Sequence, residues 1–422
     1  GGDRTPSERA DVCVVGAGPA GALVAHRLSA RRSRLMENAL SWYCLLSQNP
    51  AQFKGSMHKL VVFAGGGTAG HVFPGLAVIE TLGQRGYQDV VWIGSNGGME
   101  RGLVEAHGIR FYGIPAGKLR RYLSLRNVLD IAKVFAGFVS AIILLLRLKP
   151  AVVFSKGGYV TVPVVAAARL LGVPAGTHES DSDPGLATRI NARFVERVFL
   201  SFEASKSYFS PERQKRCVSV GNPVRRDLAE GNAERGRAFL GFGADRPVVF
   251  FVGGSLGSAQ INRLLGDMLE GLSGRCNVVH QRGDHAPLRE NDESYVSIDF
   301  IGREYADVLA AADLVVCRAG AGTLWELALT KKPAVLIPLP GSSSRGDQKR
   351  NALRFSEQGA AVVFDGDEVA ANKLEAEIVR LLESPDDRRR MAESASGFDA
   401  AGAADKIAAT LVDVMEGRGW TL

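Results

Sequence analysis

Short apolar runs recur along the chain and alternate with stretches of helical periodicity. In the first half, the runs predict buried strands over residues 60–64, 90–93, 110–114, 151–155, 175–178, 198–201 and 217–220. The second half repeats the pattern over 248–252, 278–281, 296–300, 314–317, 334–338 and 361–364. Helical periodicity separates many of these runs, for example over 72–82, 126–148 and 162–171. Strands that alternate with helices predict two parallel α/β domains.

The ends of these repeats suggest the domain organisation. The sequence Gly-Asn-Pro-Val-Arg at 221–225 is typical of a linker. We therefore predict a first domain over 57–223 and a second over 224–395, followed by a terminal helical segment over 396–422. Residues 1–56 differ from both domains.

Residues 1–56 contain a truncated dinucleotide-binding pattern. An apolar run over 11–15 leads into Gly16, Gly18 and Gly21, the spacing of a Gly-x-Gly-x-x-Gly turn. A working site also needs a second strand that ends in an acidic residue, and no strand precedes Glu37. The pattern therefore argues against a dinucleotide site. An extended gene start or an artificial tail before Met57 would explain this segment.

Bulk composition excludes few classes of function. The chain has 422 residues with a net charge of +6, which suits an anionic ligand or an acidic membrane surface. No dense basic stripe is interleaved with aromatic residues, so we do not expect nucleic-acid binding. The five cysteines include no Cys-x-x-Cys pair, so neither a zinc site nor a disulfide framework is indicated. A reducing cytosol fits best.

The longest nearly uncharged apolar segment, over 134–146, is too short to span a bilayer as a helix. It and the residues after it form either a core helix or a peripheral membrane patch, because basic residues flank them. If the segment binds a membrane, we expect Ile142, Leu145 and Leu146 to contribute.

Three glycine turns lie between a strand and a helix, where backbone N–H groups face an anion. They occupy residues 65–71, 253–259 and 318–326. A fourth polar stretch, over 178–185, places Glu179, Asp181 and Asp183 after a strand. This stretch is either a solvated turn or part of a site, and its spacing matches no EF-hand or His-based metal site.

The motifs taken together resemble the MurG family of UDP-N-acetylglucosamine transferases, which make lipid II for peptidoglycan. The resemblance runs from Met57 to about Asp413. It rests on the glycine turn at 66–71, Gly-Gly-Tyr-Val at 157–160 with His-Glu at 178–179, the 221–225 motif, Gly-Gly-Ser at 253–255, and the motifs at 317–326 and 347–352.

The resemblance implies a GT-B fold, in which two Rossmann-like domains face a cleft and the last helix returns to the first domain. It implies that the second domain binds UDP-N-acetylglucosamine and needs no metal or cofactor. The backbone of Ile301 would meet the uracil, Glu326 the ribose, and Ser255 with the start of the helix at 322–323 the diphosphate. The resemblance implies donor contacts by Thr68, Ala69, Gly70, Asp181, Arg225, Ser255, Ile301, Gly320, Ala321, Gly322, Thr323, Leu324, Glu326, Asp347 and Gln348.

By the same resemblance, the first domain would bind lipid I, a polyprenyl diphosphate that carries a muramyl-pentapeptide. Gly67, His71 and Tyr159 would contact this acceptor. The muramyl 4-hydroxyl would attack the anomeric carbon with inversion, which requires a base. His71 and Glu179 are the candidates, and His71 has a suitable ordinary pKa. Alternatively, His71 only binds phosphate.

Several residues depart from the family pattern. Ala69 stands where the family usually has glycine, and Asp181 where it usually has asparagine. Thr188 and Leu256 replace a common asparagine and glutamine. Asp181 adds a negative charge and removes an amide donor, so these changes leave open an enzyme of a divergent lineage or one with a changed acceptor.

The leading hypothesis is an inverting glycosyltransferase at the cytoplasmic face of the bacterial cell membrane, to which it binds peripherally. The alternatives are a GT-B enzyme that glycosylates another lipid, a flavin- or NAD-dependent oxidoreductase suggested by Gly16–Gly21, and a non-catalytic lipid-binding module.

Overall fold

The structure, a computed structural model, describes residues 59–421 except 68, 118–124, 255–256, 341–345 and 367–368. The chain divides into two units, Gly1–Met57 and His58–Leu422. The truncated Gly-x-Gly-x-x-Gly pattern therefore lies outside the described residues, and everything below concerns the second unit.

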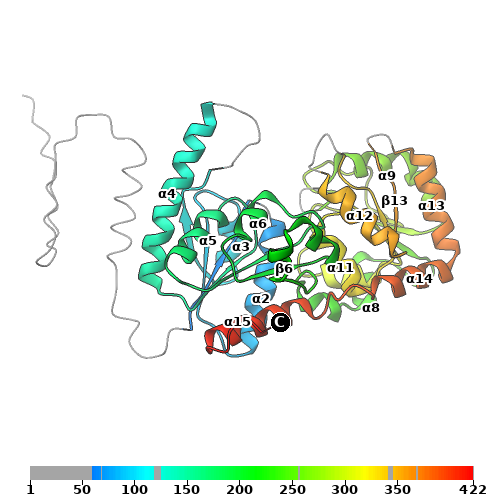
Figure 1. Ribbon diagram of the computed structural model, residues 1–422. Helices are drawn as coiled ribbons and strands as arrows, with labels where there is room; N and C mark the ends of the chain where they lie inside the picture. Colours follow the sequence, from blue (N-terminus) through cyan, green and yellow to red (C-terminus); the bar gives the residue numbers. More distant parts are fainter. Residues whose placement is uncertain are drawn as a thin grey trace, which may run out of the picture. The chain divides into compact units, whose positions relative to one another are not determined.

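The first sheet has seven parallel strands in the order β3-β2-β1-β4-β5-β6-β7; it belongs to the part of the molecule that carries α2, α4 and α5 in Figure 1. The strands are β1 (Val61–Ala64), β2 (Val90–Ser95), β3 (Arg110–Ile114), β4 (Val152–Ser155), β5 (Ala175–Glu179), β6 (Arg197–Leu200) and β7 (Cys217–Ser219). In β1, Val62 and Ala64 face one hydrophobic cluster while Val61 and Phe63 face another. Because both faces are buried, such a strand is apolar at every position.

Helices cover both faces of the first sheet. One face packs on α4 (Leu125–Leu148), α5 (Thr161–Leu170) and α6 (Leu186–Asn191). The other packs on α2 (Phe73–Gln84), α3 (Glu100–Glu105) and α15 (Ala403–Met415). The C-terminal helix α15 contributes Ile407 and Leu411 to this second cluster and contacts α2, although more than 300 residues separate them in sequence. The remaining elements are η1 (Ala69–His71), η2 (Glu203–Tyr208) and α7 (Pro211–Gln214).

The second sheet has six parallel strands in the order β10-β9-β8-β11-β12-β13. They are β8 (Val248–Val252), β9 (Asn277–Gln281), β10 (Tyr295–Ile298), β11 (Leu314–Cys317), β12 (Ala334–Leu336) and β13 (Ala361–Val363). The helical elements around it are η3 (Arg226–Glu230), α8 (Ala233–Leu240), α9 (Ala259–Leu272), α10 (Tyr305–Ala311), α11 (Ala321–Thr330), α12 (Asp347–Glu357), α13 (Ala371–Glu383) and α14 (Pro385–Ala395). The prediction of two parallel α/β domains is confirmed.

In each sheet the strand order reverses between two neighbouring strands. These are β1 and β4 in the first sheet, and β8 and β11 in the second. The loops that leave the carboxyl ends of such a pair diverge and open a crevice, where ligands of doubly wound folds bind. All three glycine turns follow one of these four strands. Among the described helices, none is long and apolar enough to cross a membrane.

Candidate functional site

Two glycine loops meet at the carboxyl edge of the first sheet. The turn after β1 contains Gly66, and the turn after β4 contains Gly158, whose φ is +85°. A Cβ added at Gly158 would stand 2.2 Å from the carbonyl oxygen of Gly66. Only glycine permits this backbone-to-backbone contact. The contact fixes the loop that carries His71 against the loop that carries Tyr159.

A buried carboxylate, which the sequence analysis missed, supports the first turn. The side chain of Glu100 accepts hydrogen bonds at Oε1 from the backbone N and the Oγ of Ser95, at 2.8 and 2.5 Å. Its Oε2 lies 3.4 Å from the backbone N of Gly67, which donates to it. The N–H of Gly67 therefore points toward a protein carboxylate. No local pattern marks Glu100, since its partners gather only when the loops fold together.

His71 lies at the end of η1, beside the second glycine loop. A Cβ added at Gly157 would stand 3.6 Å from Nδ1 of His71 and 3.8 Å from Oγ1 of Thr188. The ring of Tyr159 lies 3.5 Å from a Cβ added at Gly67. The structure thus brings together the three predicted acceptor residues. Thr68 and the side chain of Ala69 lie outside the described part of the chain; Gly70 is exposed within η1.

The stretch over 178–185 is an ordered loop, so its interpretation as a solvated turn is wrong. Glu179 is 5% exposed, and both of its carboxylate oxygens accept hydrogen bonds from the loop. Oε1 accepts from the backbone N of Asp181 at 3.1 Å, and Oε2 from that of Gly185 at 2.9 Å. Glu179 therefore organises the loop, and each of its two oxygens already accepts one hydrogen bond.

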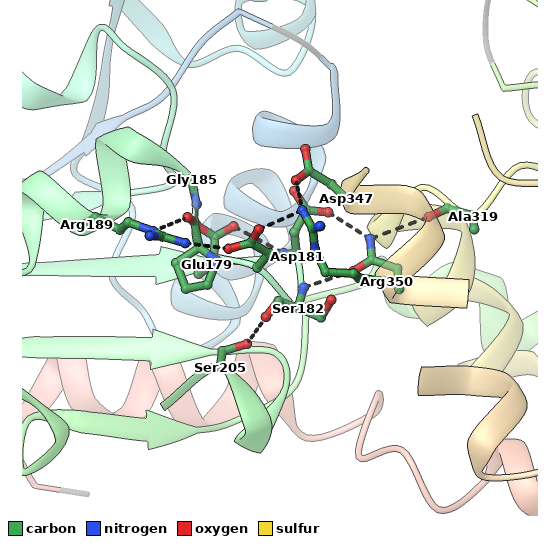
Figure 2. A network of polar contacts seen from close by, with 12 residues as sticks. Glu179, Asp181, Ser182, Gly185, Arg189, Ser205, Ala319, Asp347 and Arg350 are labelled. Carbon is green, nitrogen blue, oxygen red and sulfur yellow. Dashed lines mark hydrogen bonds and ion pairs between the residues drawn. The ribbon is translucent and has the colours of Figure 1, made fainter. Parts of the chain in front are cut away.

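Asn351 of α12 joins this loop to the second sheet. Figure 2 labels the residues that it contacts, Asp181, Ser182 and Ala319. Its Nδ2 donates to Oδ1 of Asp181 at 2.9 Å, and its Oδ1 accepts from the backbone N of Ser182 at 2.9 Å. Nδ2 also lies 3.5 Å from the carbonyl of Ala319, just before α11. One fully buried amide thus links the loop after β5 with the loop after β11.

The charge of Asp181 depends on this arrangement. Burial and the nearby carboxylate of Glu179 raise the pKa of Asp181 to about 6, whereas the hydrogen bond from Asn351 and the charge of His71 act in the opposite direction. An asparagine here would accept the same hydrogen bond but carry no charge.

A set of ion pairs surrounds the Asn351 bridge. Oxygens of Asp183 lie 2.6 Å from Nη2 of Arg189 and 2.6 Å from Nη2 of Arg350. Arg350 also pairs with Asp347, at 3.3 Å, in the first turn of α12. Arg350 therefore connects the first sheet's loop with Asp347, one of the predicted sugar contacts.

In the second sheet, helix α11 begins after β11, one of the two strands between which the strand order reverses. Gly320 precedes α11 and has extended φ and ψ angles without a side-chain cap. A Cβ added at Gly322 would have no described atom within 4 Å. The N–H groups of Ala321, Gly322 and Thr323 lie in the first turn, where an anion would be stabilised. Leu324 is fully buried, so only its backbone can take part.

Glu326 lies one turn into α11. Its Oε2 accepts a hydrogen bond from Oη of Tyr305 at 3.2 Å. Burial raises the pKa of Glu326 to about 7, although Arg225 and the Tyr305 hydroxyl lower it. Arg225 itself pairs with Asp227 at 3.5 Å. The structure thus brings Arg225 close enough to Glu326 to influence its charge.

Two glutamines hold the backbone of the second sheet's loops at Ile301 and Leu339. The side-chain oxygen of Gln281 accepts a hydrogen bond from the backbone N of Ile301 at 3.1 Å. The backbone N–H of Ile301 is therefore occupied, and its carbonyl is the backbone group that could bind a nucleobase. Gln348 accepts from the backbone N of Leu339 at 3.0 Å, and its Nε2 lies 4.0 Å from a Cβ added at Gly320. Ser255 lies outside the described residues. No group of three or more His, Cys, Asp or Glu side chains within the described ranges is arranged to hold a metal ion.

Comparison with known proteins identifies the family. The Glycosyltransferase family 28 N-terminal domain matches residues 61–200, and the Glycosyltransferase family 28 C-terminal domain matches residues 248–407. A Treponema denticola protein named UDP-N-acetylglucosamine--N-acetylmuramyl-(pentapeptide) pyrophosphoryl-undecaprenol N-acetylglucosamine transferase is 45% identical over 332 residues, which cover 74% of this chain and 85% of that protein. The chain belongs to the MurG family.

Two further relatives agree with MurG membership. A Bacillus cereus protein with the same name, numbered 2, is 41% identical over 318 residues, covering 75% of this chain and 89% of its own length. The crystal structure of Acinetobacter baumannii MurG matches with a TM-score of 0.67 and 28% identity, covering 84% of this chain and 99% of that one. The predicted resemblance and the GT-B fold are confirmed, and the oxidoreductase alternative is not favoured.

Proposed function

We infer that the protein transfers N-acetylglucosamine from UDP-N-acetylglucosamine to the muramyl 4-hydroxyl of lipid I and so forms lipid II for peptidoglycan. The observation that carries this inference is the identity of 41–45% with transferases of this name over about three quarters of the chain. Both matching domain families are those of a glycosyltransferase, and the candidate site likewise draws its loops from both sheets, which Asn351 joins.

The donor would bind at the second sheet. Its diphosphate would lie at the start of α11, with Ser255, because N–H groups and the helix dipole favour an anion there. Glu326 would accept hydrogen bonds from the ribose and Ile301 would offer its carbonyl to the uracil. Asp347, Gln348 and Arg225 would contact the sugar or the departing diphosphate. The helix start would stabilise UDP as it leaves, without a metal or another cofactor.

The acceptor would bind at the first sheet, near Gly67, His71 and Tyr159. The oxygen of the muramyl 4-hydroxyl forms a bond with the anomeric carbon while the bond from that carbon to the diphosphate breaks. The electron pair of the broken bond leaves with UDP, and the hydroxyl proton goes to His71. The Asp181 carboxylate would stabilise the resulting imidazolium. We favour His71 over Glu179 as the base because both oxygens of Glu179 already accept hydrogen bonds.

The protein would act at the cytoplasmic face of the cell membrane, which it would reach through α4. Phe135, Val139, Ile143 and Leu146 are exposed at spacings of three or four residues, so they form one apolar face. Arg147 and Lys149 at the end of this helix are exposed and suit anionic lipids. The expected role of Leu145 is wrong, because that side chain is 1% exposed and belongs to the core, where Ile142 also packs.

The decisive experiment is sugar transfer by the purified full chain, with a short-chain lipid I analogue as acceptor and several UDP-sugars as donors. We expect transfer from UDP-N-acetylglucosamine only, and inversion at the anomeric carbon. Transfer to diacylglycerol but not to the lipid I analogue would instead support a transferase for another lipid. An absence of UDP-sugar turnover would contradict the proposal.

A further inference from the structure

A buried lysine lies directly beneath the first glycine turn. Lys156 follows β4, is 1% exposed, and donates its backbone N–H to the carbonyl of Ala64 at 2.8 Å. Its Cβ lies 3.4 Å from a Cβ added at Gly65, and its Cγ lies 3.4 Å from one added at Gly75. The aliphatic stem of Lys156 therefore fills the space under the segment that leads to His71.

The ammonium of Lys156 binds the residues on both sides of Glu179. Its Nζ lies 2.5 Å from Nδ1 of His178 and donates to Oγ of Ser180 at 3.0 Å. Nε2 of His178 lies 2.9 Å from the carbonyl of Gly221. Because a carbonyl only accepts, Nε2 carries the proton and Nδ1 accepts from Lys156. Burial and Lys156 lower the pKa of His178 well below its ordinary value, so this ring is neutral.

The same network continues to the segment between the two sheets. Oγ of Ser180 donates to Oδ1 of Asn222 at 2.8 Å. All four side chains are buried: Lys156, His178, Ser180 and Asn222. One cation thus anchors the start of the loop whose far side is bonded to Asn351.

The titratable groups that face Lys156 come from few elements. His178 and Glu179 belong to β5, and Asp181 belongs to the loop that follows; Gly65 and Gly75 line the stem. His71, on η1, lies against the next residue, Gly157. Burial lowers the pKa of Lys156 to about 7, whereas Glu179 and Asp181 raise it.

An ammonium is a costly choice for this position if its role is only to fill space. An apolar side chain of similar volume often replaces a buried charge with no loss of stability. We propose that Lys156 is a positioning residue for sugar transfer, which holds the Glu179–Asp181 loop in place and favours the ionised form of Asp181. This proposal rests on the proposed function and gives Lys156 no contact with substrate.

The test measures kcat and KM of the full-length chain from acidic to alkaline pH. The wild-type assay comes first, so that its failure would count against the proposed function and not against Lys156. For the wild type we expect kcat to rise as Asp181 ionises near pH 6 and to fall as Lys156 loses its proton near pH 7.

In Lys156→Met, we expect kcat to fall on the order of tenfold or more while the KM for UDP-N-acetylglucosamine stays within about twofold. Loss of the nearby positive charge raises the pKa of Asp181, so the rising limb of the plot of kcat against pH moves to higher pH. The falling limb of that plot disappears, because the variant has no lysine at this position to lose a proton. A variant with wild-type kcat and both limbs unmoved would overturn the proposal.

Lys332→Met is a matched control. Lys332 is partly buried, and its Nζ donates to the carbonyls of Ala310 and Ala312 at 2.7 and 2.8 Å, beyond the far end of α11. Its removal should leave both limbs in place. If Lys156→Met does not fold, Ser180→Ala decides the question. That variant removes one acceptor from the ammonium, so the falling limb should move to lower pH, and an unmoved limb would overturn the proposal.

Discussion

The charge of a single residue, Glu326, is expected to control donor binding near neutral pH. A carboxylate accepts hydrogen bonds from ribose hydroxyls most strongly when ionised, and burial raises the pKa of Glu326 to about 7. UDP should therefore bind the ionised form, and its affinity should increase as pH rises through about 7. Calorimetric titration with UDP on both sides of that pH checks this expectation.

Two substitutions separate the charge of Glu326 from its shape. Glu326→Gln should weaken UDP binding about tenfold and remove the part of its pH dependence that comes from Glu326, because the amide does not titrate; the terminal phosphate of UDP, which ionises near pH 6, still contributes its own part. Tyr305→Phe removes a donor that lowers the pKa of Glu326, so the rise in affinity should move to higher pH. A Glu326→Gln variant that binds UDP like the wild type would exclude the ribose contact.

His71 is expected to affect turnover far more than donor affinity. If it accepts the proton of the acceptor hydroxyl, His71→Ala should lower kcat by about 10²- to 10⁴-fold while the dissociation constant of UDP changes little. Turnover assays and calorimetry on the same preparation test both parts. Unchanged turnover would remove His71 as the base, and an equal loss in both quantities would favour a phosphate-binding role.

At the scale of a single element, helix α4, which is labelled in Figure 1, has one face in the core and one face exposed. Leu144 and Leu145 pack on the first sheet, whereas Phe135 and Leu146 are 68% and 56% exposed. Changing Phe135, Ile143 and Leu146 together to serine should reduce co-sedimentation with anionic vesicles at least about tenfold, since each removes apolar area.

The control for α4 is Phe239→Ser. Phe239 is an exposed apolar residue of α8, which packs around the second sheet. Its substitution should leave vesicle binding unchanged. Equal vesicle binding by the triple α4 variant and the wild type would contradict the membrane role of this face. Sugar transfer to a soluble acceptor analogue should continue in the triple variant and in the wild type.

Strands were the easiest elements to predict. Each of the thirteen predicted strands is present in the described residues. Strands such as β1, β4 and β8 are buried at every position, and such a strand is an uninterrupted apolar run. The short helices α3, α6, α8 and α10 were not predicted. Each spans at most eight residues, about two turns, which is too short to repeat an apolar face. Their positions depend on tertiary packing.

The polar network of the site was less accessible from the sequence than its glycine turns. Glycine turns after apolar strands locate Gly66 and Gly320 directly. In contrast, Glu100 and Lys156 have partners that the chain brings together only on folding, and neither lies in a recognised pattern. The loop after β5 was identified as polar, but nothing local indicated that Glu179 uses both oxygens within it.

For the whole molecule, the bridge at Asn351 connects the loops of the two sheets. Both ends of its amide are bonded to the loop after β5, while its backbone belongs to α12. Asn351→Ala would leave the buried N–H of Ser182 without its acceptor. We expect a loss of about 1–3 kcal/mol in the free energy of unfolding. We also expect a fall in kcat, because the loop after β5 loses its amide contacts with α12 and with the loop before α11.

Arg354→Ala is the control for the bridge, since Arg354 lies on the same helix and pairs across its surface with Glu357, at 3.0 Å. An exposed ion pair of this kind contributes little to stability, so the free energy of unfolding should change by less than about 1 kcal/mol. Denaturant unfolding of both variants measures their stability, and small-angle scattering measures the size of the molecule. If the two sheets depend on this bridge, only Asn351→Ala should enlarge the unliganded molecule, and saturating UDP-N-acetylglucosamine with acceptor analogue should reverse part of the change. Equal stability and size in the two variants would show that Asn351 does not join the halves of the site.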